Sequence, residues 1–263
     1  MNKLLLGRYI PQDSMIHRLD PRLKLVAGFY FIALIFLCNN FLTYAMMFAV
    51  LLLLVLLAKV KVTFFIKGMQ SMFWLILLTV ILQLLFSSGT PVLFHWGVIT
   101  ITGLGIKNAI FVFIRFILII SFSTLLTLTT SPLALADATE SLLSPLKKLH
   151  VPVHEIALML SIALRFVPTL VDEAQKIMDA QRSRGVDFDS GNLIKKAKAM
   201  IPLLIPLFVS CFNRAEDLAD AMEARGYRGG EGRSKFRKLT WHIADTGGLI
   251  FLLGLTALII LMR

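Results

Sequence analysis

Two arginines, Arg184 and Arg225, are the residues of this sequence best suited to a directed polar contact, and each is followed by a glycine. A guanidinium group can bind a carboxylate or a backbone carbonyl through two parallel hydrogen bonds. Gly185 and Gly226 are 41 positions apart, and when the two glycines are superimposed, the segments that precede them have several residues in common. The matched pairs are Ala174/Ala215, Asp179/Asp220, Ala180/Ala221 and Arg184/Arg225, and Ile177 and Leu218 are alike in character. Two copies of one short element predict contact with two copies of one partner.

Each arginine continues the apolar stripe of a predicted amphipathic helix. Steps of four and three residues connect the stripe positions, as on one face of an α-helix. The stripes are Leu170, Ala174, Ile177, Gln181 and Arg184 in the first helix, and Cys211, Ala215, Leu218, Met222 and Arg225 in the second. The arginine is therefore expected at the helix tip, and the glycine after it can adopt a left-handed conformation that ends the helix. For either site alone, a simpler interpretation stays open, because such an arginine also stabilises the helix dipole and such a glycine is an ordinary C-cap.

The remaining reactive side chains show no spacing typical of a catalytic or metal site. His150 and His154 are four residues apart, but Pro152 separates them and no acidic or cysteine partner is close. No Gly-x-x-x-x-Gly-Lys-Ser/Thr run is present, so the chain is not expected to bind ATP itself. Cys38 and Cys211 are expected to be buried apolar residues. We therefore predict that the chain is not an enzyme and that it holds no metal and no cofactor.

The composition is that of a membrane protein. Of the 263 residues, 57% are hydrophobic and only 16% are charged, and the mean hydropathy is +0.79. A soluble domain would be far less apolar. The formal net charge of +11 would suggest nucleic acid in a soluble protein. Here the tendency of Lys and Arg to collect in cytoplasmic segments explains the charge, so the expected partner is the lipid bilayer and not nucleic acid.

Five apolar runs approach the roughly 20 residues that span a bilayer. They cover residues 23–38, 41–58, 69–86, 108–128 and 243–262. Turn residues at 87–91 and a β-branched and aromatic segment at 92–101 predict a small outer hairpin, with Trp96 near the headgroups. The distribution of Lys and Arg predicts that the N-terminus lies inside and the C-terminus outside. Arg115 lies within the fourth run and is expected to pair with a carbonyl or carboxylate of the bundle, or to snorkel.

The most polar part of the chain, residues 131–242, predicts amphipathic helices. The first is expected over 133–149, with Ser131 as its cap and Pro132 at its first position. Two long helices are expected over 153–184 and 192–225, with Pro202 and Pro206 bending the second. The basic, glycine-rich segment 226–238 is predicted to be a loop. The fold class is therefore an all-α membrane protein with about five transmembrane helices, a group of long amphipathic helices and a small outer hairpin.

In these residues the chain resembles the transmembrane coupling subunits, or T components, of energy-coupling factor (ECF) transporters. These transporters are ATP-driven importers of vitamins and trace metals in prokaryotes. The resemblance covers essentially the whole chain. It is carried by His17–Lys24, Ser131–Ala138, Leu146–Leu149, Ala163–Pro168 and Met222–Tyr227, together with Ser183-Arg184-Gly185.

The resemblance implies two kinds of partner. Two homologous ABC ATPase subunits, which would bind the ATP and magnesium, would receive one helix tip each. The docking residues would be Ser183, Arg184 and Gly185 in the first tip and Ala224, Arg225 and Gly226 in the second. Ser183 departs from the alanine that is usual at its position, so the two tips need not be equivalent. A small substrate-binding membrane protein, the S component, would contact the apolar parts of the long helices, with Met159, Leu160, Met200, Leu204 and Phe208 as candidates.

We therefore expect a non-catalytic energy-coupling subunit of a vitamin or micronutrient importer, located in the prokaryotic cytoplasmic membrane. The predicted domains are a membrane domain at 1–130, a cytoplasmic coupling-helix domain at 131–242 and a last transmembrane helix at 243–263. Two alternatives stay open. One is a self-sufficient permease with its own substrate path, for which only Gln83 and Arg115 offer polar groups within the spans. The other is the T component of a dedicated cobalt- or nickel-type importer.

Overall fold

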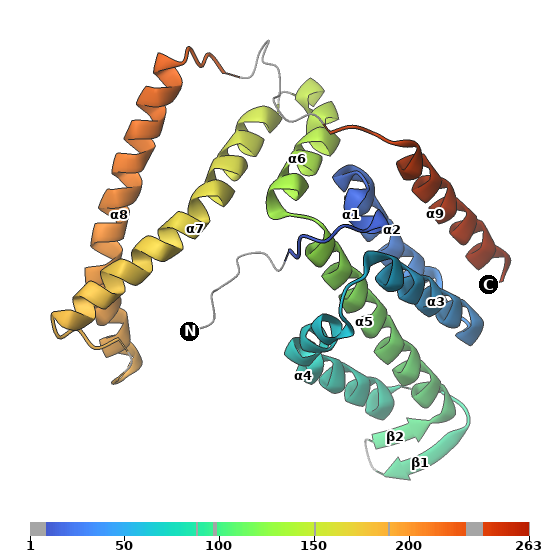
Figure 1. Cartoon of the computed structure of the whole chain (residues 1–263). Helices are drawn as coiled ribbons and strands as arrows, with labels where there is room; N and C mark the ends of the chain where they lie inside the picture. Colours follow the sequence, from blue (N-terminus) through green and yellow to red (C-terminus); the bar gives the residue numbers. More distant parts are fainter. Residues whose placement is uncertain are drawn as a thin grey trace. The chain divides into compact units, whose positions relative to one another are not determined.

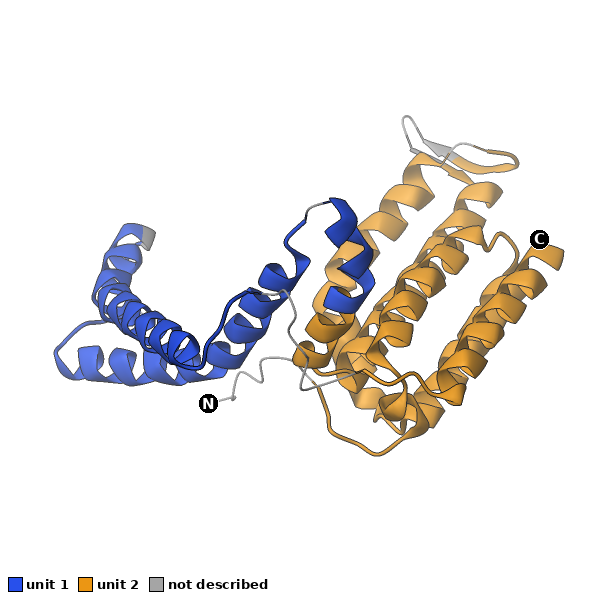
Figure 2. Ribbon diagram, turned by 90° about the horizontal axis from the view of Figure 1, so that it is seen from above, with its two compact units in different colours: residues 1–6, 140–238 blue, residues 7–139, 239–263 orange. Residues whose placement is uncertain are grey.

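A computed structural model describes residues 9–87, 89–96, 99–149, 151–188, 190–229 and 239–262. The described chain forms two compact units, which Figure 2 shows in different colours. Unit 1 contains residues 140–229, and unit 2 contains residues 9–139 and 239–262. The side chain of Trp96, His150 and the loop residues 230–238 lie outside the described part, and so do the predictions made for them. The predicted division into three domains stays a prediction.

Unit 2 consists of helices with one small sheet (Figure 1). The helices that lie wholly within it are α1 (Met15–Arg18), α2 (Pro21–Leu37), α3 (Phe41–Ala58), α4 (Val62–Phe86), α5 (Gly103–Thr129) and α9 (Ile243–Leu261). Strands β1 (Val92–Trp96) and β2 (Ile99–Thr102) pair antiparallel, with Val92 opposite Thr102 and an irregularity between Val92 and Phe94. The predicted hairpin and the all-α class are confirmed.

Local capping explains where these helices begin. The Asp20 carboxylate accepts the Arg22 N–H at the start of α2, with Pro21 in the first position. Asn40 and Thr43 form a reciprocal capping box at the start of α3. The bounds of α3 match the prediction. α4 begins at Val62 and α5 at Gly103, earlier than predicted, because a lysine with a long apolar stem does not end a helix.

Five described helices are long and apolar enough to cross a membrane by length and composition: α3, α4, α5, α9 and α7 (Val153–Ser183). The number agrees with the prediction, but the set differs from it. The run predicted at 23–38 forms α2, which has 17 residues and a length of about 25 Å. α7, predicted as an amphipathic coupling helix, qualifies because the part before Asp172 carries only two charged residues, Glu155 and Arg165.

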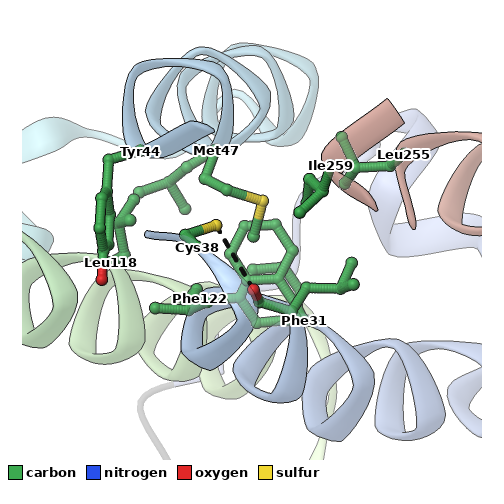
Figure 3. Close-up of a cluster of buried hydrophobic side chains, with 11 residues drawn as sticks. Phe31, Cys38, Tyr44, Met47, Leu118, Phe122, Leu255 and Ile259 are labelled. Atoms are coloured by element: carbon green, nitrogen blue, oxygen red, sulfur yellow. Dashed lines mark hydrogen bonds between the residues drawn. The ribbon is translucent and has the colours of Figure 1, made fainter. Parts of the chain in front are cut away.

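The core of unit 2 joins α2, α3, α5 and α9 (Figure 3). It consists of Phe31, Leu34, Ile35, Cys38, Tyr44, Met47, Leu51, Leu118, Phe122, Leu255 and Ile259. Phe31 stacks on Phe122 with 4.2 Å between ring centroids. The Cys38 side chain is buried, as predicted, and its thiol donates to the carbonyl of Leu34. Cys211, in unit 1, is only partly buried, so the same prediction was wrong there.

α6 (Pro132–Leu143) begins as predicted, because the Ser131 hydroxyl accepts the N–H of Ala134 at 3.3 Å. The predicted helix over 133–149 is wrong in its second half. Residues Ser144–Leu149 form a 3₁₀ turn, since Pro145 has no N–H to continue the α-helical ladder. In unit 1, α7 crosses α8 (Leu193–Ala224), as Figure 1 shows. α8 continues through Pro202 and Pro206 without interruption.

Candidate functional site

The two predicted docking segments end their helices in the same backbone geometry. Arg184 has φ −88° and ψ 5°, and Arg225 has φ −86° and ψ 6°. The glycines that follow are left-handed, with φ 87° at Gly185 and 72° at Gly226. Each end forms the two hydrogen bonds of a Schellman motif. They are Gly185 N–Arg182 O (2.9 Å), Val186 N–Gln181 O (3.0 Å), Gly226 N–Glu223 O (2.8 Å) and Tyr227 N–Met222 O (3.0 Å). The predicted glycine-terminated ends are confirmed, and their docking role stays a prediction.

Both arginine side chains at these ends are exposed, and neither forms a hydrogen bond or ion pair with any residue that the structure describes. A guanidinium that is left unpaired at a fixed helix end is available to a carboxylate or carbonyl of another molecule. A small residue precedes the arginine at both ends, Ser183 at the first and Ala224 at the second. The Ser183 hydroxyl donates to the carbonyl of Asp179 at 3.1 Å, so Ser183 presents mainly its methylene group, much as Ala224 presents its methyl group.

A polar cluster joins α7 and α8 where they cross. One carboxylate oxygen of Glu173 accepts from Arg214 Nη2 at 2.8 Å, and the other accepts from the hydroxyl of Ser210. Farther along α7, the Gln181 amide donates to the carbonyl of Pro202 at 3.4 Å. Because Pro206 has no N–H, that carbonyl has no helical donor, and Gln181 takes its place. Residue numbers rise on one helix as they fall on the other, so the two helices run in opposite directions.

The crossing lies at matched positions of the two repeats. Glu173 and Arg214 are 41 positions apart, the same offset as that between the two glycines. Arg184 follows Glu173 by eleven residues, and Arg225 follows Arg214 by eleven, which is about 16 Å along each helix. The antiparallel directions therefore put the two tips on opposite sides of the crossing (Figure 1). Two helix segments of this length separate the tips by roughly 30 Å. Our sequence reasoning missed this cluster, although opposite charges at a matched position were a usable signal.

An apolar groove of about 390 Å³ lies between α7 and α8 on the side of the crossing that leads to Arg225. α7 contributes Ile162, Ala163, Phe166, Val167 and Leu170, and α8 contributes Cys211, Arg214, Ala215, Leu218, Ala219 and Met222. The groove includes every apolar stripe position predicted before Arg225. Of the first stripe it includes only Leu170, because Gln181 lies beyond the crossing, where it contacts Pro202. The stripe of α8 therefore faces α7 across the groove and ends at the second tip.

The five residues predicted to contact an S component are all exposed. Their exposed fractions are 61% for Met159, 43% for Leu160, 42% for Met200, 44% for Leu204 and 62% for Phe208. On α8 they adjoin further exposed apolar side chains: Ile201, Ile205, Val209 and Phe212. The ring centroids of Phe208 and Phe212 lie 6.5 Å apart. An exposed apolar surface of this extent is typical of a contact with protein or lipid.

The segment His17–Lys24, quoted above for the resemblance, connects four helices at one end of unit 2. The buried Lys24 ammonium donates to the carbonyls of His17 and Thr129, each at 3.1 Å. The Asp20 N–H donates to Asp245 Oδ1 at 2.8 Å, and the other oxygen of Asp245 caps α9 by accepting the N–H of His242. Asp245 therefore caps α9 and also holds the start of α2. These contacts give the segment a structural role in joining α1, α2, α5 and α9.

His17 is held in its neutral form within this segment. Its Nε2 lies 3.1 Å from the carbonyl oxygen of Ile10, which can only accept, so Nε2 carries the proton and Nδ1 accepts from the Ser14 hydroxyl at 2.7 Å. Burial, and then the nearby Lys24 ammonium, lower the pKa of His17 below its usual 6.5. On the exposed side of α1, a hydrogen bond from Arg18 and its charge lower the pKa of Asp13.

Comparison with known proteins gives consistent matches over almost the whole chain. The family model described as cobalt transport protein (CbiQ) matches residues 12–236. Several relatives carry the name "Energy-coupling factor transporter transmembrane protein EcfT". The one from Lacticaseibacillus paracasei is 58% identical over 98% of this chain and 99% of its own length. The relatives from Listeria innocua and Bacillus subtilis are 57% and 48% identical, each over 100% of this chain and 99% of their own length.

Proposed function

Because the chain belongs to the CbiQ family, and within it to the T components of energy-coupling factor transporters, we propose that it couples ATP hydrolysis by two homologous ATPase subunits to the movement of a substrate-binding S component. The protein is a multi-pass protein of the cell membrane. In this proposal it has no catalytic activity and binds no cofactor. The ATPases bind ATP and magnesium, and the S component selects the vitamin or other micronutrient.

The observation that carries the proposal is the pair of matched helix ends. Arg184 and Arg225 have the same backbone geometry, are exposed and have no partner among the described residues. Since the ends lie roughly 30 Å apart, one small pocket cannot hold both. Two similar ATPases, each with one acidic or carbonyl-lined groove, fit this arrangement. The Ser183-Arg184-Gly185 end would occupy one groove and the Ala224-Arg225-Gly226 end the other.

The crossing supports a way to transmit motion. Glu173, Ser210 and Arg214 join α7 and α8 at the crossing, and each docking end lies about 16 Å from this cluster. Gln181 adds a second contact between the helices, closer to the first end. A rigid arm of this length turns by about 10° when its end moves by about 3 Å. ATPases that approach and separate would therefore change the angle between the helices. The exposed apolar residues of α8, such as Met200 and Phe208, would pass this change to the S component.

Charge reversal at both ends tests the proposal. We expect Arg184→Glu combined with Arg225→Glu to abolish co-purification of the ATPases and to abolish uptake, while the protein still inserts into the membrane. The matched control is Lys196→Glu with Lys198→Glu, which changes the charge by the same amount on two exposed residues of α8. Normal uptake by the first variant, or an equal loss in the control, would contradict the docking role.

The family description favours one second candidate, the T component of a dedicated cobalt- or nickel-type importer. Docking to the ATPases would be the same in both cases, so charge reversal does not separate them. Purification of the complex from native membranes does, because a dedicated importer would contain a single kind of S component. Several kinds of S component in the purified material would favour the shared vitamin importer.

A further inference from the structure

Arg115 lies near the middle of α5, and its contacts differ from the predicted ones. Its Nε and Nη2 both donate to the hydroxyl oxygen of Tyr44, at 3.2 Å and 2.9 Å. The guanidinium carbon lies 5.1 Å from the centroid of the Phe36 ring. Tyr44 is buried at the edge of the core, and Figure 3 shows its hydroxyl on the side of α5. A hydroxyl and an aromatic ring hold the guanidinium in place, but neither carries a compensating negative charge.

A second cation lies two turns earlier on the same helix. Lys107 is exposed, and its ammonium lies 5.5 Å from the centroid of the Phe111 ring. Phe111 stacks on Tyr44, with 5.0 Å between the ring centroids. The spacing of four residues from Lys107 to Phe111 and from Phe111 to Arg115 puts the three on one face of α5. We call Lys107, Phe111, Arg115 and Tyr44 the α5 strip.

The surrounding sequence offers this strip no acidic side chain. Residues 21–136 contain no Asp and no Glu. The only acidic residue of α9, Asp245, lies in the first turn of that helix. The opposite end of α9 is the one that meets the α2–α3 turn, where Asn40 Nδ2 donates to the carbonyl of Met262 at 3.2 Å. A permanent positive charge in a membrane-spanning helix is costly without an anion, and the helices that surround the strip in unit 2 supply none.

The depth of Arg115 indicates which anion is near. The Lys24–Thr129 hydrogen bond aligns the start of α2 with the end of α5. From that level α2 and α3 extend only about 25–27 Å, whereas α5 extends about 40 Å and reaches the hairpin. Arg115 lies about 21 Å from the same level, close to where the two short helices end. Helices shorter than the roughly 30 Å hydrocarbon layer, joined by a polar Asn39-Asn40 turn, draw the headgroups inward at this place.

We propose that the α5 strip binds the phosphate group of an anionic phospholipid, in the leaflet that surrounds the α2–α3 turn. Arg115 is partly exposed and donates to the phosphate oxygens, while Tyr44 fixes the direction of its guanidinium. Lys107 adds a second positive charge nearer to water. Phe36, with 58% of its surface exposed, and its exposed neighbour Phe41 present the apolar surface on which an acyl chain lies.

Lipid titration of the purified full-length chain, followed by native mass spectrometry, tests this site. We expect Arg115→Gln to weaken binding of phosphatidylglycerol by about tenfold or more, because one charge-assisted contact is removed. Lys107→Gln, at an exposed position that folding does not require, is expected to weaken it less. Lys61→Gln, an exposed lysine outside the strip, is the matched control and is expected to leave binding unchanged.

Several results would overturn the proposal. Two concern the variants: unchanged phosphatidylglycerol binding by both the Arg115 and Lys107 variants, or an equal loss of phosphatidylglycerol binding by the Lys61 variant. Two concern the wild type: equally tight binding of phosphatidylcholine, or displacement of the lipid by inorganic phosphate at matched concentration. Loss of a co-purifying membrane subunit from the Arg115 variant, with lipid binding intact, would assign the anion to a protein instead and would also reject the lipid site.

Discussion

Replacing Gly226 by alanine tests whether the backbone of the second docking end positions its arginine. Gly226 has φ 72°, and a Cβ added there meets no atom within 4 Å, so the substitution brings conformational strain and no clash. An L-residue in the left-handed region costs about 1 kcal/mol or somewhat more. Since 1.4 kcal/mol is a factor of ten, the Schellman end should open about fivefold more often. Arg225 would keep its charge and lose its fixed direction.

Hydrogen exchange and ATPase co-purification measure the two consequences. The amide of Tyr227, which donates to Met222, should exchange about fivefold faster in the Gly226→Ala variant, and ATPase affinity should fall by a similar factor. Gly226→Asn should recover most of both, because asparagine tolerates the left-handed region. Gly229→Ala is the matched control, since Gly229 has φ 90° and an equally open surrounding but lies outside the docking end.

The reasoning would be refuted if Gly226→Ala and Gly229→Ala lowered ATPase affinity equally. It would also be refuted if the asparagine variant behaved like the alanine variant. In the first case the loss of affinity would not depend on the docking end, because Gly229 lies outside it. In the second case the loss would not arise from the left-handed conformation of residue 226.

Two further predictions concern the polar contacts of each unit. Glu173→Gln should lower the melting temperature of the protein and reduce uptake, because Arg214 loses its charged partner at the crossing. ATPase co-purification should persist, because the docking ends are unchanged. Loss of co-purification would contradict this separation of roles. Stability should also fall as pH is lowered from about 6.5 through the lowered pKa of His17, because the unfolded chain binds this proton more readily than the folded one. His17→Gln should flatten that part of the pH profile, and a profile with the same slope in the variant would assign the titration to another group.

The features that the sequence predicted well are those with a local signature. The bounds of α3 follow from an uninterrupted apolar run between Asn40 and Lys59, and the two helix ends follow from glycine after a periodic stripe. The 3₁₀ turn at Ser144–Leu149 was predictable from Pro145, but the apolar pattern continued through it and favoured a helix. α4 begins before the predicted run at 69–86 for a related reason, because Lys67 interrupts the apolar pattern but fits on the helix.

The contacts that were missed join residues far apart in the chain. The Tyr44 partner of Arg115 and the Thr129 carbonyl partner of Lys24 depend on which helices become neighbours, and neither periodicity nor spacing contains that information. For the same reason, the sequence identified Arg115 as unusual and could not choose among its possible partners.

The Glu173–Arg214 pair has a physical logic that follows from the repeat itself. When two copies of a helix cross in an antiparallel manner about an approximate twofold axis, each residue far from the axis meets a different position of the other copy. Only the residue at the axis meets its own counterpart, so two identical charges there would repel each other. Glutamate in one copy and arginine in the other remove that repulsion and join the helices. A charged residue midway between the matching ends therefore needs the opposite charge at the same position of the other copy, and Glu173 and Arg214 meet this condition.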